Sequence, residues 1–241
     1  MTGSRARVLA ALGWAVCTVG AVPASAADPA AARALARLRK NLAPLSDLAA
    51  EVTVTTALKG FLTEQVYRQR YAYAFRRPAS VRVDFREPAG RLVIARGRTV
   101  WVNGKAAQGP DKPEDAASPL SLWALSLGGP ALDREYAITS FAEPAHQRLV
   151  GLALTPRSGG ATAVRLKIWV DMDRGVVEES KVFGAEDALL STSAVSRFAR
   201  LAGMWLPVEI TTLGCEGRCR TVVDYAGVRV NAGLSGSLFT P

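Results

Sequence analysis

Hydrophobic and polar residues alternate along most of the chain from Leu48 onward. Tyr71, Tyr73 and Phe75 fall on one side of an extended strand, because successive side chains of a strand point to opposite faces. Arg77 follows on the same side, at the end of this aromatic row. The segment from 81 to 86 alternates apolar and charged residues in the same way. The pattern predicts an antiparallel sheet with one apolar and one solvated face, which can curl around an apolar ligand.

Turn residues divide this alternating sequence into short strands. Lys59-Gly60, Pro88-Ala89-Gly90 and Asp173-Arg174-Gly175 are typical turn sequences. The connections are short enough for antiparallel neighbours. The predicted strands run from 48 to the turn at 59–60, from 65 to 76, through three segments between 78 and 103, and then over 136–141, 148–155, 164–170, 176–183, 189–198, 206–213 and 220–230.

Helical spacing is found near the start of this region. Asp28 is a plausible N-cap for a helix that runs to Asn41, and Leu35, Leu38 and Leu42 form a narrow apolar stripe along it. We expect this stripe to lie across one mouth of the sheet.

A second short apolar helix is predicted over residues 119–128, with Ser118 as its N-cap and Pro119 in its first turn. A polar loop that opens at Asn103-Gly104 precedes it. The fold class is therefore mainly β with a few helices.

Residues 1–26 have the composition of a secretory signal peptide. Arg5 and Arg7 precede an apolar run over 8–22, and Ala24-Ser25-Ala26 is a small-residue cleavage site. The apolar run is shorter than the roughly 20 residues that a membrane-spanning helix needs. We expect an exported periplasmic protein, cleaved near Ala26, whose residues 27–241 form one domain.

The formal charge of +9 favours anionic partners without identifying one. Lys and Arg are scattered along the predicted strands, as in Arg68, Arg70, Arg82 and Arg86, which is typical of a solvated face. Export also separates the protein from the genome. Nucleic acid is therefore disfavoured as a partner.

An ordered series of motifs resembles the LolA-like family of periplasmic carriers, which shuttle lipoproteins from the inner to the outer membrane. The first half carries Phe75-Arg76-Arg77-Pro78, a strand to Pro88, and Val100-Trp101 after Gly97. The second half carries similar segments over 152–156 and 167–170 and the turn at 173–175. The resemblance covers most of residues 31–241. The chain departs from the family pattern at 203–207 and 215–219, where the last strands are longer.

The resemblance implies an incomplete, half-open antiparallel barrel whose concave face is covered by helices and holds acyl chains. It implies acylated lipoproteins or lipids as cargo, an inner-membrane loading complex and an outer-membrane acceptor as partners, a monomer, and no cofactor. In the family the arginine of the Arg-Pro step helps to hold the helical lid closed through hydrogen bonds to helix backbone. Arg77 matches that position, and we expect it to be buried with its donors paired rather than to be an ordinary strand-end arginine that reaches solvent.

The apolar positions of the alternating strands are candidates for the wall of the acyl-chain cavity, although plain core residues have the same pattern. Trp101 and Trp169 are out of phase with them and are expected to pack outside, under a helix. The candidate wall residues are Tyr71, Tyr73, Phe75, Val83, Phe85, Ile94, Val102, Leu166 and Ile168.

Cys215 and Cys219 lie across a predicted hairpin tip, and in an oxidising compartment a small-loop disulfide is favoured. A metal site needs further ligands, and His146 is expected to be a surface residue of the turn at Pro144. The sequence has no nucleophile elbow and no phosphate-cradling glycine loop, so an enzyme is disfavoured. A carrier of free lipid or glycolipid, and a non-enzymatic sensor of envelope stress, remain open as alternatives to a lipoprotein carrier.

Overall fold

The computed structural model describes residues 28–241 apart from 61–62, 79, 97–98, 107–135 and 158–163. Its strands form one sheet of 13 strands in the order β6-β5-β4-β3-β2-β1-β13-β12-β11-β10-β9-β8-β7. Neighbouring strands are antiparallel, and β1 pairs with β13 in the middle of the sheet. The edge strands β6 and β7 do not pair with each other, so the sheet is open.

The strands are β1 (Asp47–Lys59), β2 (Glu64–Arg76), β3 (Ser80–Glu87), β4 (Ala89–Arg96), β5 (Thr99–Val102), β6 (Lys105–Ala106), β7 (Tyr136–Phe141), β8 (Leu149–Pro156), β9 (Arg165–Asp171), β10 (Val176–Phe183), β11 (Leu189–Leu201), β12 (Met204–Gly214) and β13 (Cys219–Val230). Short 3-10 helices are η3 (Pro144–His146), η5 (Ala185–Asp187), η6 (Cys215–Gly217) and η7 (Gly236–Phe239). Each strand predicted beyond residue 135 corresponds to an observed strand, with ends that differ by at most three residues.

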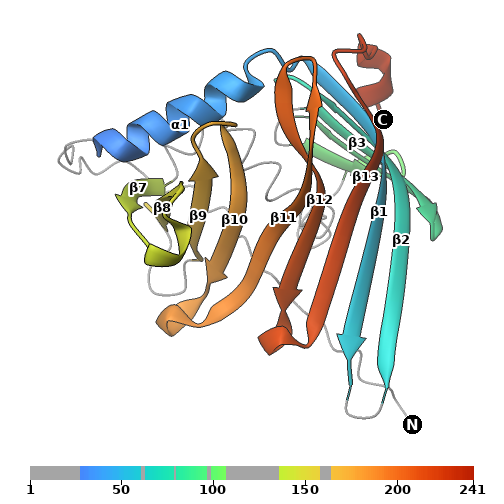
Figure 1. The fold of residues 1–241 in the computed structure, drawn as a ribbon. Helices are drawn as coiled ribbons and strands as arrows, with labels where there is room; N and C mark the ends of the chain where they lie inside the picture. The colour runs from blue at the N-terminus through green and yellow to red at the C-terminus, as the bar shows by residue number, and fades with distance from the viewer. Residues whose placement is uncertain (1–27, 61–62, 79, 97–98, 107–135, 158–163) are drawn as a thin grey trace.

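The sheet is curled, and the helix α1 (Pro29–Leu42) crosses one end of its concave side (Figure 1). The side chain of Asp28 accepts hydrogen bonds from the backbone N–H groups of Ala30 and Ala31, which caps the helix. The predicted stripe of Leu35, Leu38 and Leu42 is buried against the sheet. Helix α1 packs against β7, β8, β10 and β12. The predicted curled open sheet and its covering helix are therefore confirmed.

Two sequence predictions lie outside the described residues. They are the signal peptide and the second helix at 119–128. Within the described ranges, no helix combines the length and the apolar composition needed to cross a membrane.

The core lies between α1 and the concave face of the sheet, which we call the inner face. Val83 on β3 is paired with Tyr73 on β2 and with Val93 on β4, so these three side chains share the inner face. Ile94 is instead paired with Arg82 and Trp101 and points to the outer face. The prediction of Ile94 as a wall residue is corrected: Leu92, Val93 and Ile94 are consecutive apolar residues, so alternation alone does not say which one points inward.

Candidate functional site

The inner face of β1, β2 and β3 is a continuous aromatic and aliphatic surface. Tyr71, Tyr73 and Phe75 on β2 are 4%, 4% and 8% exposed, and they lie opposite Val52, Ala50 and Leu48 on β1. The rings of Tyr71 and Phe85 are 5.3 Å apart between centroids. All of these residues belong to one hydrophobic cluster that includes the buried face of α1. The pattern of alternation in the sequence thus corresponds to one surface in space.

Three tyrosines place hydroxyl groups within this apolar surface. Burial raises the pKa of Tyr71 above its usual value, and burial followed by the neighbouring Tyr71 does the same for Tyr73. Burial also raises the pKa of Tyr225 on β13, with smaller effects from Tyr71 and Tyr73. These side chains are neutral at any physiological pH, so the inner face carries polar groups without charge.

The second half of the sheet continues the same surface. Ile168 on β9 is fully buried, and Leu166 is partly buried against the cluster. Val102 on β5 is also partly buried against it and lies opposite Val93. The structure thus brings together all the predicted wall residues except Ile94, and adds Val93, which the sequence analysis missed. A signal for Val93 was present in the sequence. Val100 and Val102 alternate on the neighbouring strand β5, and Val102 is the direct cross-strand partner of Val93.

Farther from α1 than the apolar residues described above, hydroxyl side chains cross the inner face in a line. We call this line the hydroxyl row. Its members are direct cross-strand partners on β1, β13, β12, β11 and β10. Two pairs are hydrogen bonded, at 3.0 Å between the hydroxyls of the first pair and 2.8 Å between those of the second. Each pair uses one hydroxyl proton, so the other remains available to an acceptor. In order the row is Thr56, Thr221, Thr212, Ser193 and Ser180.

Arg77 follows directly after β2 and contacts the end of α1. Its Nη2 donates a hydrogen bond to the carbonyl oxygen of Leu42 at 2.7 Å. Leu42 is the last residue of the helix, where carbonyl groups lack helical partners. The side chain of Arg77 is exposed, so the expectation of a buried arginine is wrong. The resemblance did predict the hydrogen-bond partner of Arg77, which is a backbone carbonyl of the covering helix.

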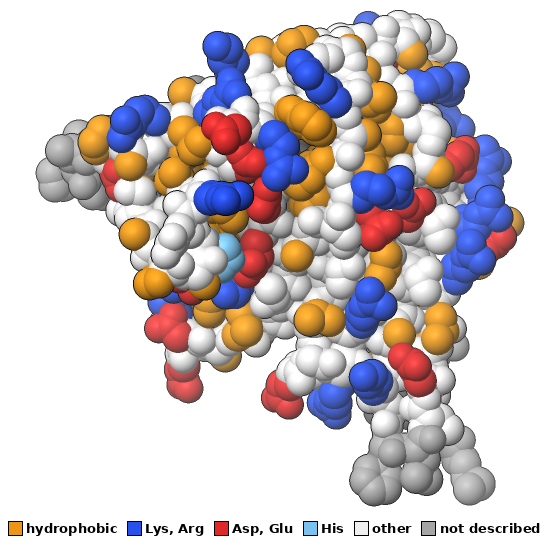
Figure 2. Space-filling model, viewed as in Figure 1, with side chains coloured by type: hydrophobic (Ala, Val, Ile, Leu, Met, Phe, Trp, Pro, Cys, Tyr) orange, Lys and Arg blue, Asp and Glu red, His pale blue; other side chains and the backbone are white. Residues whose placement is uncertain are grey.

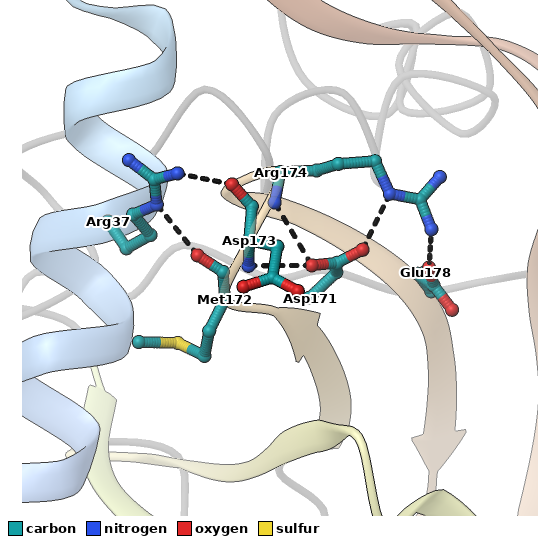
Figure 3. A network of polar contacts seen from close by, with 6 residues as sticks. All are labelled: Arg37, Asp171, Met172, Asp173, Arg174 and Glu178. Carbon is teal, nitrogen blue, oxygen red and sulfur yellow. Dashed lines mark hydrogen bonds and ion pairs between the residues drawn. The ribbon is translucent and has the colours of Figure 1, made fainter.

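The other side of α1 is held by several contacts. Arg37 donates from Nε to the carbonyl of Met172 at 2.7 Å and from Nη2 to the carbonyl of Asp173 (Figure 3). Asn41 makes two hydrogen bonds with the backbone of Trp205, at 2.8 and 2.9 Å. Asp28 accepts a hydrogen bond from the backbone N–H of Ser140 at 2.6 Å. These contacts join the helix to β7, to the β9–β10 turn and to β12.

Beside Arg37, the β9–β10 turn carries its own charge network (Figure 3). Arg174 Nε lies 2.5 Å from Asp171 Oδ2, and its Nη2 contacts Glu178. Burial alone would raise the pKa of Asp171, but hydrogen bonds from Arg174 and Asp173 and the charge of Arg174 lower it overall. The network lies in the turn that α1 contacts through Arg37.

The outer face of the second half holds the only histidine of the chain. His146 Nε2 lies 3.0 Å from Glu179 Oε2, and its ring packs 4.8 Å from that of the buried Trp169. His146 lies in the predicted turn at Pro144 and is partly exposed, at 19% of its side chain. Trp169 does lie outside the inner face and beneath η3, as expected from its phase.

Among the described residues, no three His, Cys, Asp or Glu side chains lie together as a metal site.

Cys215 and Cys219 are joined in a disulfide between β12 and β13. The β12–β13 hairpin tip that it closes lies at the end of the sheet remote from α1 (Figure 1).

An open antiparallel sheet whose apolar inner face is covered by a helix is the architecture of LolA-like binding proteins. Comparison with known proteins agrees with this class. The chain is 29% identical over 152 residues to an outer-membrane lipoprotein carrier protein of Chromobacterium violaceum. The aligned region covers 62% of this chain and 71% of the relative. A family model described only as an uncharacterized protein matches residues 132–241.

Solved structures show the same fold. A DUF1329 family protein from Desulfovibrio piger superposes with a TM-score of 0.69 at 19% identity, covering 88% of this chain and 97% of the other. A LolA superfamily protein from Nitrosomonas europaea gives a TM-score of 0.64 at 16% identity, with the same coverage of 88% and 97%. The LolA-like resemblance of the sequence motifs is therefore confirmed. The family is one of carrier and binding proteins.

Proposed function

We propose that the protein is a periplasmic carrier that binds the acyl chains of lipoproteins between α1 and the inner face and transfers them from the inner to the outer membrane. The observation that carries this proposal is the continuous apolar inner face, which runs from β5 to β9 and has α1 across one end. The similarity to an outer-membrane lipoprotein carrier supports the same cargo. Residues 1–26 serve as the export signal, and residues 27–241 act as one monomeric, non-enzymatic domain.

The energetics suit an acyl ligand. Burying a methylene group contributes about 0.8 kcal/mol, so two acyl chains supply a large driving force for entry. The hydroxyl row gives the ligand a direction. The chains lie on the apolar residues near α1, and the ester and amide groups at their polar end face the one free hydroxyl proton of each bonded pair in the hydroxyl row.

In this carrier Arg77 controls the position of α1. Its single hydrogen bond to Leu42 holds the end of the helix that leads into β1. Because Arg77 is exposed, breaking this bond leaves its guanidinium solvated and costs little. A loading complex at the inner membrane and an acceptor at the outer membrane therefore need only a modest interaction energy to open the helix.

A carrier of free lipid or glycolipid is the second candidate, favoured by the hydroxyl row, which suits sugar or glycerol hydroxyls equally well.

The proposal is tested by photo-crosslinking in the native periplasm. A photoreactive residue replaces Tyr73, which faces inward, and as a matched control it replaces Trp101, which faces outward on a nearby strand. Adducts are identified by mass spectrometry. We expect acylated lipoprotein peptides at position 73 and none at 101. Free lipid alone at position 73 would support the second candidate, whereas equal labelling at both positions or an unacylated protein would contradict a carrier.

A further inference from the structure

A second concave site lies on the outer side of the molecule, separate from the inner face. It is a pocket of about 360 Å³ between the last turns of α1, the β9–β10 turn and the tip of the β11–β12 hairpin. Trp205, which lines it, alternates along β12 with Met204 and Leu206, whose side chains belong to the core cluster. The pocket therefore opens away from the acyl-chain surface, and its occupancy needs no acyl cargo.

The charged residues that line this pocket are four cations and one carboxylate: Arg37, Lys40, Arg174 and Arg200, with Asp173. Figure 2 shows Lys and Arg side chains gathered along the upper part of the face in view, over α1 and the neighbouring hairpin ends. We call this the basic pocket. Its volume is at the lower end of the range of small-molecule sites in proteins, and it matches a small anionic group rather than a chain.

The cations differ in how far their charge is already compensated. Arg174 is paired with Asp171 and Glu178, so its charge is largely neutralised. Arg37 donates to two backbone carbonyls, which orient its guanidinium without cancelling its charge. Among the residues that the structure describes, Lys40 and Arg200 lie within ion-pair distance of no carboxylate. The basic pocket thus holds more positive than negative charge.

Basic residues at the end of a helix also offset the helix dipole, and Arg39 and Lys40 in the last turn of α1 do so. That role does not account for Arg200. This residue comes from β11, on a different hairpin, and its guanidinium lies 5.9 Å from the centre of the Trp205 ring. It lines the same pocket as the helix cations Arg37 and Lys40, and an anion bound between cations would relieve their mutual repulsion.

We propose that the basic pocket binds a phosphate group between Lys40 and Arg200. Guanidinium groups match phosphate oxygens in a bidentate geometry, and lysine adds a compact point charge. Because the two cations come from α1 and from the β11–β12 hairpin, a bound phosphate bridges the helix to the sheet next to the Asn41–Trp205 hydrogen bonds. The phosphate belongs either to an anionic lipid headgroup at a membrane surface or to a free phosphate compound in solution.

The test measures binding of inorganic phosphate to the purified protein by isothermal titration calorimetry. It then measures sedimentation with phosphatidylglycerol vesicles and with neutral phosphatidylcholine vesicles. The pocket variant carries both substitutions, Lys40→Gln and Arg200→Gln. The control is Arg68→Gln with Arg220→Gln, which removes the same charge from exposed positions on β2 and β13 away from the pocket. Circular dichroism checks that each variant is folded, and Arg200→Lys tests whether the charge alone suffices.

We expect saturable binding to the wild type, a loss of at least tenfold in affinity in the pocket variant, and nearly unchanged affinity in the control. Phosphatidylglycerol vesicles that bind and are displaced by phosphate would identify a headgroup as the source. Phosphate binding without vesicle binding would identify a free phosphate compound. Equal binding by the pocket and control variants, or no binding by the wild type, would overturn the site. Because the readout uses no acyl cargo, its failure leaves the proposed carrier function untouched.

Discussion

Helix α1 is attached very differently to the two halves of the sheet that it covers. Toward β7–β12, Asp28, Arg37 and Asn41 make hydrogen bonds along its whole length. Toward β1–β5, a side-chain hydrogen bond runs from Arg77 to the last carbonyl of the helix. Among the described residues, more of the side-chain hydrogen bonds of α1 therefore go to the second half of the sheet. Opening of the inner face is therefore expected along the Arg77 side, with the helix still docked on the β9–β10 turn and β12.

Gly175 in the β9–β10 turn lies close against α1, and its replacement should have the largest effect on stability. A Cβ atom there would lie 2.8 Å from the carbonyl oxygen of Arg37, and φ is +68°. Gly175→Ala should lose roughly 1–2 kcal/mol from the left-handed backbone and roughly 1–3 kcal/mol more from the collision with α1. Urea denaturation measures the change.

Gly203→Ala is the matched control for this prediction. Gly203 also has a positive φ, of +81°, but its Cβ would meet nothing within 4 Å. We expect it to lose only the backbone contribution. Equal losses at the two glycines would show that the approach of the β9–β10 turn to α1 contributes little to holding the helix.

A smaller effect is expected at the start of the helix when the pH falls. Hydrogen bonds from Ser140, then from Ala31 and Ala30, lower the pKa of Asp28 from 3.8 to about 2. Its contribution to stability is therefore complete above pH 3.8 and is lost as the pH falls toward 2. Asp28→Asn retains a capping side chain without the charge. The stability difference between wild type and variant should shrink over this pH window, and a constant difference would refute the assignment.

The smallest effect on stability is expected on the weakly held side. Arg77→Leu removes one hydrogen bond to a helix end, which is worth about 0.5–1.5 kcal/mol. Amide hydrogen exchange should become faster near Leu42 and stay unchanged at the start of α1. The transfer of cargo to an acceptor should nevertheless change clearly. A variant that transfers cargo at the wild-type rate would remove Arg77 from control of the helix.

The strands and the first helix follow from local patterns that the sequence contains. Alternation at Tyr71, Tyr73 and Phe75 assigns all three to one face, and the leucine spacing after Asp28 assigns the buried side of α1. The motif around Arg77 also indicated a helix carbonyl as its partner. Alternation failed at Ile94, because Leu92, Val93 and Ile94 are all apolar and their order does not show which of them points inward. Only the pairing of Ile94 with Trp101 shows that Ile94 points outward.

The sequence by itself thus determined the elements, the apolar side of most strands and the family resemblance, because each depends on residues close together in the chain. The tertiary structure decided that Arg77 is exposed, that His146 packs against Trp169, and that Arg200 and Lys40 line the same pocket. These contacts join segments that are distant in the chain, and they depend on strand register and on how far the sheet curls. Local periodicity determines neither, because both result from pairing and packing across the whole sheet.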